Sequence, residues 1–127
     1  MATALVWFRR DLRLADNPAL TAATQAGYGI VPVFIHAPQE AGTWPPGEAS
    51  DWWLHFALQA LASTLQRRGC KLVIRQGPSL SALLDLARQA GAEAVYWNRL
   101  YEPALVERDR SIKAALRGQG LHVESHN

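Results

Sequence analysis

The chain has 127 residues, which is enough for one domain with a hydrophobic core. Its apolar fraction of 49% and charged fraction of 19% exclude a disordered polymer, and its apolar runs are too short for a membrane helix. The net charge of +2 is too small to predict nucleic-acid binding by itself. A single cysteine and an N-terminus without a secretory signal favour the cytoplasm.

Strand and helix patterns begin to alternate at once. The apolar run at 4–8 predicts a strand that is covered on both faces. Asn17 followed by Pro18 predicts the start of a helix, because Asn caps free N–H groups and proline loses nothing at the first helical position. That helix is expected to end at Gly27, and a second strand follows at 30–35.

The rest of the chain continues the alternation after a loop at 36–48. A long helix is expected from about residue 50 to residue 68, with leucines at helical spacing along one side and Gly69 at its end. Tryptophans in strands and helices are expected in the core, at positions 7, 52, 53 and 97. The later elements are a strand at 71–76, a helix at 80–90, a strand at 94–97, a helix at 104–117 and a strand at 121–125.

Five alternating strands predict a Rossmann-like α/β domain with a parallel sheet and helices on both faces. Right-handed crossovers favour the strand order 3-2-1-4-5. Ligands bind such sheets at the carboxyl ends of the strands where the order reverses. Those ends are Phe8 and Trp97, so a ligand site is expected beside the residues that follow them.

The stretch after the first strand is unusually rich in charge. Asp11, Arg13 and Asp16 fit two readings: a network that fixes the turn, or part of a ligand site. Arg9 and Arg10 are the better candidates for holding an anion or a polar ring, because adjacent side chains point in different directions and one can face the crevice.

The sequence lacks several motifs that are typical of phosphate-binding, catalytic and metal sites. No glycine-rich phosphate loop follows the first strand, and there is no nucleophile elbow. The histidines lack the spacing of metal ligands, and only His36 lies near the predicted crevice. Trp44, in the long loop, needs either a surface or a ligand to cover it. The sequence therefore predicts a binding crevice and neither a catalytic residue nor a metal site.

The same charged stretch resembles the N-terminal signature of the DNA photolyase and cryptochrome family, R-x-D-L-R-x-x-D-N. Similarity to the family continues through 49–77 and 94–127, so it covers essentially the whole chain, and it is greatest to bacterial deoxyribodipyrimidine photolyases. The signature residues present here are Arg9, Asp11, Leu12, Arg13, Asp16 and Asn17.

This resemblance implies an N-terminal α/β domain, spanning 1–127, that carries a light-harvesting antenna chromophore, a reduced folate or a deazaflavin. In the family a larger helical domain binds FAD, contacts damaged DNA and splits pyrimidine dimers, and that domain is absent from this chain. The fragment is therefore expected to be inactive as a lyase alone, with no catalytic residue of its own. Isolated, it is expected to expose an apolar patch and to self-associate.

The antenna is expected to contact residues around the crevice and in the two loops beside it: Arg9, Arg10, His36, Ala37, Trp44, Tyr101 and Glu102. Ring edges would take hydrogen bonds from Arg10 and Glu102, and Trp44 or Tyr101 would cover an aromatic face.

The two antenna types leave different signatures, and neither is complete here. Folate-binding bacterial members place an Asn-Glu pair where this chain has Ala-Leu at 104–105, so Glu102 or Glu107 would have to supply the carboxylate. Deazaflavin-binding members use the second arginine after the first strand, which Arg10 matches, and an aspartate where this chain has Leu100. A reduced folate and a deazaflavin therefore both remain candidates for the antenna.

Two other functions fit the same fold. A cryptochrome would use the domain for blue-light signalling, and this domain's sequence separates signalling from repair poorly. A free-standing nucleotide-binding domain is the third reading, against which the missing phosphate loop counts.

Overall fold

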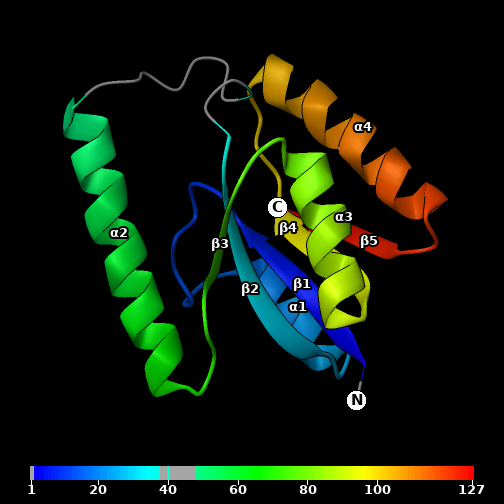
Figure 1. The fold of residues 1–127 in the computed structure, drawn as a ribbon, viewed down its shortest axis with the longest axis horizontal. Coiled ribbons are helices and arrows are strands. Elements are labelled where there is room, and N and C mark those ends of the chain that lie inside the picture. The colour runs from blue at the N-terminus through cyan, green and yellow to red at the C-terminus, as the bar shows by residue number, and fades with distance from the viewer. Residues whose placement is uncertain (1, 38–39, 41–47) are drawn as a thin grey trace.

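A computed structural model describes residues 2–37, 40 and 48–127 of the chain. Five parallel strands form one sheet in the order β3-β2-β1-β4-β5 (Figure 1), which confirms the predicted order. The central strand β1 (Thr3–Phe8) pairs with β2 (Gly29–His36) on one side and β4 (Ala92–Asn98) on the other. The edges of the sheet are β3 (Val73–Gln76) and β5 (His122–His126).

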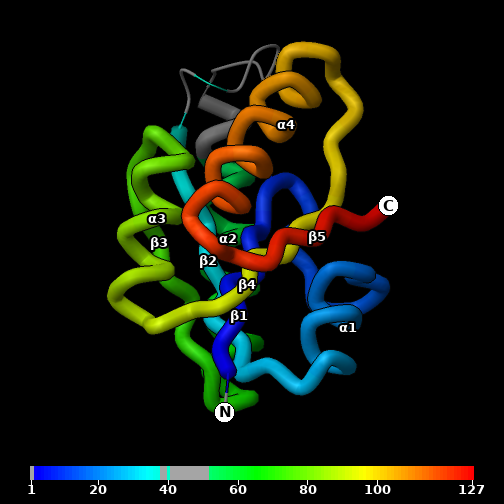
Figure 2. The backbone as a smooth tube through the Cα atoms, turned by 90° about the vertical axis from the view of Figure 1, so that its right-hand side faces the viewer, coloured from blue at the N-terminus to red at the C-terminus, as the bar shows by residue number. Residues whose placement is uncertain are grey.

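Helices cover both faces of this sheet. One face packs against α3 (Ser79–Ala90) and α4 (Pro103–Gly118), and the other packs against α1 (Pro18–Gln25) and α2 (Glu48–Arg67). Figure 2 shows α1 and α3 on opposite sides of the central strands. None of the described helices is long and apolar enough to cross a bilayer.

The strand β1 is apolar without interruption because both of its faces are buried. Leu5 and Trp7 belong to the cluster beneath α3 and α4, whereas Ala4, Val6 and Phe8 belong to the cluster beneath α1 and α2. Successive strand side chains point to opposite faces, so a doubly covered strand requires an apolar residue at every position.

The predicted start of α1 is confirmed in detail. Asn17 has extended backbone, and its side-chain oxygen accepts a hydrogen bond from the backbone N–H of Leu20 at 3.1 Å. Pro18 occupies the first helical position. Gly27 follows the helix with a φ of +89°, a conformation that glycine adopts without steric cost.

The expectation that all the strand and helix tryptophans are in the core is wrong for two of them. Trp7 and Trp97 are buried and meet edge-to-face, with ring centroids 5.2 Å apart. Trp52 and Trp53, on α2, are 67% and 50% exposed. The side of α2 that packs on the sheet is the leucine side, which includes the buried Leu61, and helical geometry turns the tryptophans away from it.

Candidate functional site

The turn after β1 is fixed by the side chain of Asn98, which stands at the end of β4. Its amide nitrogen donates to Asp11 Oδ2 at 2.5 Å and to Asn17 Oδ1 at 2.7 Å, and its oxygen accepts from the backbone N–H of Ala19 at 2.9 Å. Asp11 also accepts from the backbone N–H of Arg9 at 2.9 Å. These contacts tie β1, the start of α1 and β4 together at the predicted crevice.

Arg13 and Asp16 complete the turn through backbone atoms. The Arg13 guanidinium donates to the Asp16 carbonyl oxygen at 3.1 and 3.3 Å, and Asn17 donates to the Arg13 carbonyl at 2.9 Å. Asp16 has a φ of +49°, a left-handed conformation that aspartate tolerates better than most residues. The turn-fixing reading of Asp11, Arg13 and Asp16 therefore accounts for their contacts.

Arg9 points into the domain and not into the open crevice. It is only 7% exposed, and its Nη1 donates to both carboxylate oxygens of Asp109 at 2.8 Å. Its Nη2 donates to the carbonyl of Asn98, and the guanidinium lies 4.6 Å from the centroid of the Trp7 ring. Burial lowers the pKa of Arg9, while Asp109 opposes that shift. Arg9 therefore holds the end of β4, beside the crevice, from inside the domain.

Arg10 and Glu102 form an ion pair at the surface of the crevice. Their side chains retain 31% and 34% of their exposure, so both can still be reached by a ligand. Glu102 stands directly before α4, and its own backbone N–H together with the Arg10 guanidinium lowers the pKa of its carboxyl group. The pair presents donors and acceptors side by side between the ends of β1 and β4.

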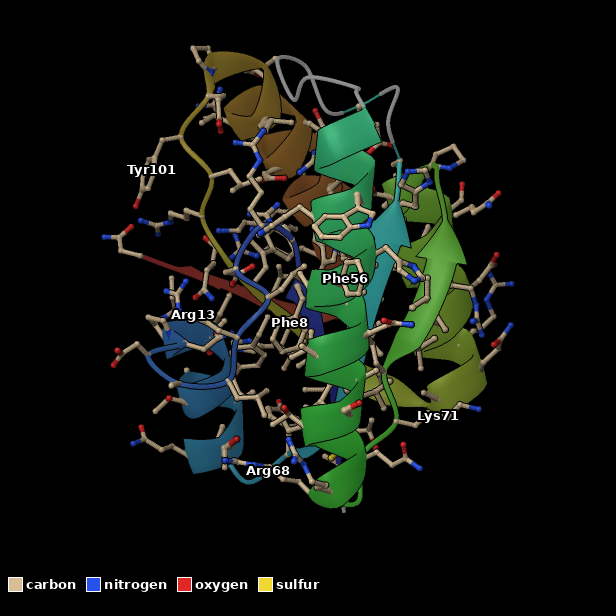
Figure 3. All side chains as sticks on the ribbon, turned by 90° about the vertical axis from the view of Figure 1, so that its left-hand side faces the viewer. Phe8, Arg13, Phe56, Arg68, Lys71 and Tyr101 are labelled. Atoms are coloured by element: carbon tan, nitrogen blue, oxygen red, sulfur yellow. The ribbon has the colours of Figure 1, made fainter. Side chains whose placement is uncertain are left out.

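The other predicted contact residues surround this pair or lie beyond it. Tyr101 is 68% exposed, and its hydroxyl donates to Asn127 Oδ1 at 2.7 Å; Figure 3 shows it on the segment before α4. His36 is exposed at the end of β2. Ala37 packs so closely on Gly77 that a Cβ at Gly77 would lie 2.6 Å from the Ala37 Cβ. Trp44 lies outside the described residues.

A pocket of about 300 Å³ opens beside the crevice, between residues 99–101, α4 and β5. Among the residues that line this pocket, the sequence predicted only Tyr101 as a ligand contact. The sequence analysis also missed Asn98 and Asp109. Asn98 directly follows the strand that was expected at 94–97, and Asp109 lies one helical turn from Lys113. The pocket is lined by Trp97, Arg99, Leu100, Tyr101, Val106, Asp109, Arg110, Lys113 and Ser125.

Metal chemistry finds no support in the part of the chain that the structure describes. No group of three or more histidine, cysteine, aspartate or glutamate side chains in it is arranged to hold a metal ion. The crevice instead offers hydrogen bonds and charges for an organic ligand.

Comparison with known proteins identifies the scaffold that carries this crevice. The profile of the family described as DNA photolyase matches residues 4–127. The chain belongs to the DNA photolyase family. It corresponds to the N-terminal α/β domain of that family, as the signature after β1 indicated.

Both photolyases and cryptochromes are among the relatives. The chain is 44% identical over 124 residues to the deoxyribodipyrimidine photo-lyase of Agrobacterium fabrum, covering 98% of this chain and 25% of that protein. It is also 44% identical to Cryptochrome-1 of Sinapis alba, covering 97% of this chain and 25% of that protein. The crystal structure of a class III photolyase from Agrobacterium tumefaciens superposes with a TM-score of 0.91 at 43% identity, covering 98% of this chain and 25% of that one.

Proposed function

We propose that this domain holds the light-harvesting antenna chromophore of a photolyase that repairs pyrimidine dimers, and that it is not catalytic by itself. The chain spans about a quarter of the length of the relatives it matches. The remaining length in a full protein would supply the helical domain, its FAD and the surface that meets damaged DNA. The DNA photolyase family to which the chain belongs supports this division of labour.

The Arg10–Glu102 pair is the observation that carries the proposal. It lies at the carboxyl ends of β1 and β4, which is where parallel sheets of this order bind ligands. A guanidinium and a carboxylate that are each about one-third exposed complement a ring edge that has both carbonyl acceptors and N–H donors. Pterins and deazaflavins both have such edges, so a reduced folate or a deazaflavin is the expected ligand.

The other predicted contacts would extend the site in two directions. Tyr101 presents an exposed ring on one side of the pair, suited to covering an aromatic face. His36 and Ala37 stand at the end of the neighbouring strand β2, and Trp44 follows in the same connection. Arg9 would act from beneath, by holding the end of β4 through the Asn98 carbonyl.

A titration of the 127-residue chain tests the proposal. We expect a reduced folate or a deazaflavin to bind with a perturbed near-ultraviolet absorption band. Arg10→Gln and Glu102→Gln should each weaken binding by about tenfold or more, because each removes a charge-assisted hydrogen bond. Arg88→Gln, an exposed arginine on α3, is the matched control.

Two results would count against antenna binding by this crevice. One is an unchanged absorption spectrum with both chromophores at millimolar concentration. The other is a loss of affinity in Arg88→Gln as large as in Arg10→Gln. Circular dichroism of each variant separates loss of binding from loss of fold.

A cryptochrome-type signalling role is the second candidate, favoured by the 44% identity to Cryptochrome-1 of Sinapis alba. A chimera distinguishes the two, in which this chain replaces the matching quarter of the Agrobacterium photolyase. Light-dependent dimer repair by the chimera supports a repair domain, whereas FAD binding without repair favours signalling.

A further inference from the structure

The pocket between α4, β5 and residues 99–101 is lined by side chains that, apart from Tyr101, the antenna proposal does not use. We propose that it binds a small aromatic anion of mononucleotide size, with the anionic group held by Arg99, Lys113 and Ser125. The site shares Tyr101 with the proposed antenna contacts but makes no use of Arg10 or Glu102, so variants of those two residues test the two proposals separately. Its support comes from the donors, the charges and the shape of the pocket.

The donors converge on one hydroxyl group. Lys113 Nζ lies 2.6 Å from Ser125 Oγ, and Arg99 Nε donates to the same oxygen at 3.1 Å. With both lone pairs of the Ser125 hydroxyl taken by cationic donors, its own proton is left to donate. An ammonium, a guanidinium and a hydroxyl proton in one place form a cradle for an oxyanion.

The positive charge of this cradle is poorly offset. Burial and the nearby guanidinium groups of Arg117 and Arg99 lower the pKa of Lys113, so two further cations lie close to its ammonium group. Asp109 is the carboxylate that opposes this shift, but it is shared by Arg9 and Arg108 at 2.8 and 3.0 Å. An incoming anion would relieve the repulsion among these groups.

The other nearby carboxylates are also committed. Glu107 pairs at 2.5 Å with Arg110, which itself lines the pocket. Glu124 lies next to Ser125 in β5, and alternation along the strand turns it to the opposite face of the sheet. There it contacts His122 and His126 at 2.6 and 3.0 Å. Both carboxylates are thus paired with groups other than Arg99 and Lys113.

An apolar seat for a planar ring adjoins the cradle. Trp97, Leu100 and Val106 line the same pocket, and its volume of about 300 Å³ is at the lower limit of small-molecule sites. The exposed Tyr101 ring is held at the rim by the hydrogen bond from its hydroxyl to Asn127 Oδ1. An aromatic ring beside an anion cradle suits a nucleoside monophosphate, since its base can stack while its phosphate pairs.

Titration with adenosine monophosphate, followed by the backbone amide resonances of Leu100 and Ser125, tests this site. We expect saturable shifts with a Kd below about 1 mM, and at least about tenfold weaker binding of adenosine and of inorganic phosphate. Lys113→Gln should weaken the binding of adenosine monophosphate by about tenfold or more, and Lys113→Arg should restore most of the affinity. Lys71→Gln, an exposed lysine before β3, is the control and should bind as the unchanged chain does.

The outcomes separate the parts of the proposal. No saturable shift at 5 to 10 times that concentration, about 5–10 mM, would overturn the site as a whole. Adenosine binding as tightly as its monophosphate would overturn the anion cradle, and phosphate binding as tightly would overturn the ring seat. An equal loss in Lys71→Gln would show non-specific charge attraction. An Arg10→Gln chain that loses antenna binding but keeps nucleotide binding would establish that the two sites are separate.

Discussion

Arg9 and Asp109 are charged residues held inside the domain, and their positions in the chain differ by a hundred residues. The sequence placed Arg9 correctly at the end of the first strand, but it could not reveal the partner, because the contact depends on how α4 packs over the sheet. The local contacts of the turn were easier to anticipate. Asn17 was predicted as a helix cap from its position before Pro18 alone, whereas its contact with Asn98 needs the sheet to form first.

Breaking the Arg9–Asp109 pair should strongly destabilise the domain. Asp109→Ala leaves a buried guanidinium without its carboxylate, so we expect the free energy of unfolding to fall by about 3–5 kcal/mol in a urea titration. Asp85→Ala, which removes an exposed pair with Arg88, should change it by less than about 1 kcal/mol. Equal effects of the two substitutions would show that the buried pair has no special role.

Tyr96 provides a test at high pH. It is 1% exposed, and burial and the hydrogen bond to Glu124 raise its pKa to about 12. Because the folded pKa lies above the ordinary value of 10.0, its contribution to stability is complete below pH 10.0 and is lost as the pH rises through about 12. Tyrosinate absorbance should show a step near this pH that Tyr96→Phe removes. A spectrum in which the substitution removes an earlier step instead would contradict the buried hydrogen bond.

At the scale of the elements, strand order and helix starts follow from the alternation of apolar runs with capping residues. The outward aromatic residues of α2 did not follow from composition, since tryptophan is usually buried. They follow from helical spacing, because Phe56 lies one turn after Trp52 and shares its exposed side, with ring centroids 4.5 Å apart. Asn98 was missed because its partners lie in the turn between β1 and α1, which only the folded sheet brings to the end of β4.

Asn98 is the side chain that joins these elements, so its removal should loosen the start of α1. Asn98→Ala leaves the Ala19 N–H without its side-chain acceptor and removes the hydrogen bond to Asp11 Oδ2, so we expect a loss of about 2–3 kcal/mol of unfolding free energy. Hydrogen exchange should accelerate in the first turn of α1 before it does in α3. Gln89→Ala, an exposed change on α3, should stay within about 0.5 kcal/mol. Uniform acceleration across the chain would contradict a local anchoring role.

For the whole molecule, the exposed aromatic surface of α2 is the feature that a folded domain would be expected to cover. Trp52, Trp53 and Phe56 are 67%, 50% and 49% exposed, and Figure 3 looks onto the helix that carries them. Clustered exposed aromatic side chains of this kind promote association.

We therefore predict concentration-dependent self-association of the isolated chain. Sedimentation velocity should show species larger than the 14.0 kDa monomer as the concentration rises. The double variant Trp52→Ser/Phe56→Ser should remain monomeric, while Ile74→Ser, an exposed apolar residue on the edge strand β3, serves as the control. Association that persists in the double variant and disappears in the control would assign the contact to the sheet edge instead.

We propose that this domain harvests light for a partner domain through a chromophore held at Arg10 and Glu102. The most direct test is the action spectrum of dimer repair by the chimera with the Agrobacterium photolyase, reconstituted with FAD and either antenna chromophore. Repair should follow the antenna absorption band as well as that of FAD, and Arg10→Gln should remove the antenna contribution while leaving the FAD contribution. An action spectrum that follows FAD alone, with the antenna chromophore present in excess, would contradict light harvesting through a chromophore held at Arg10 and Glu102.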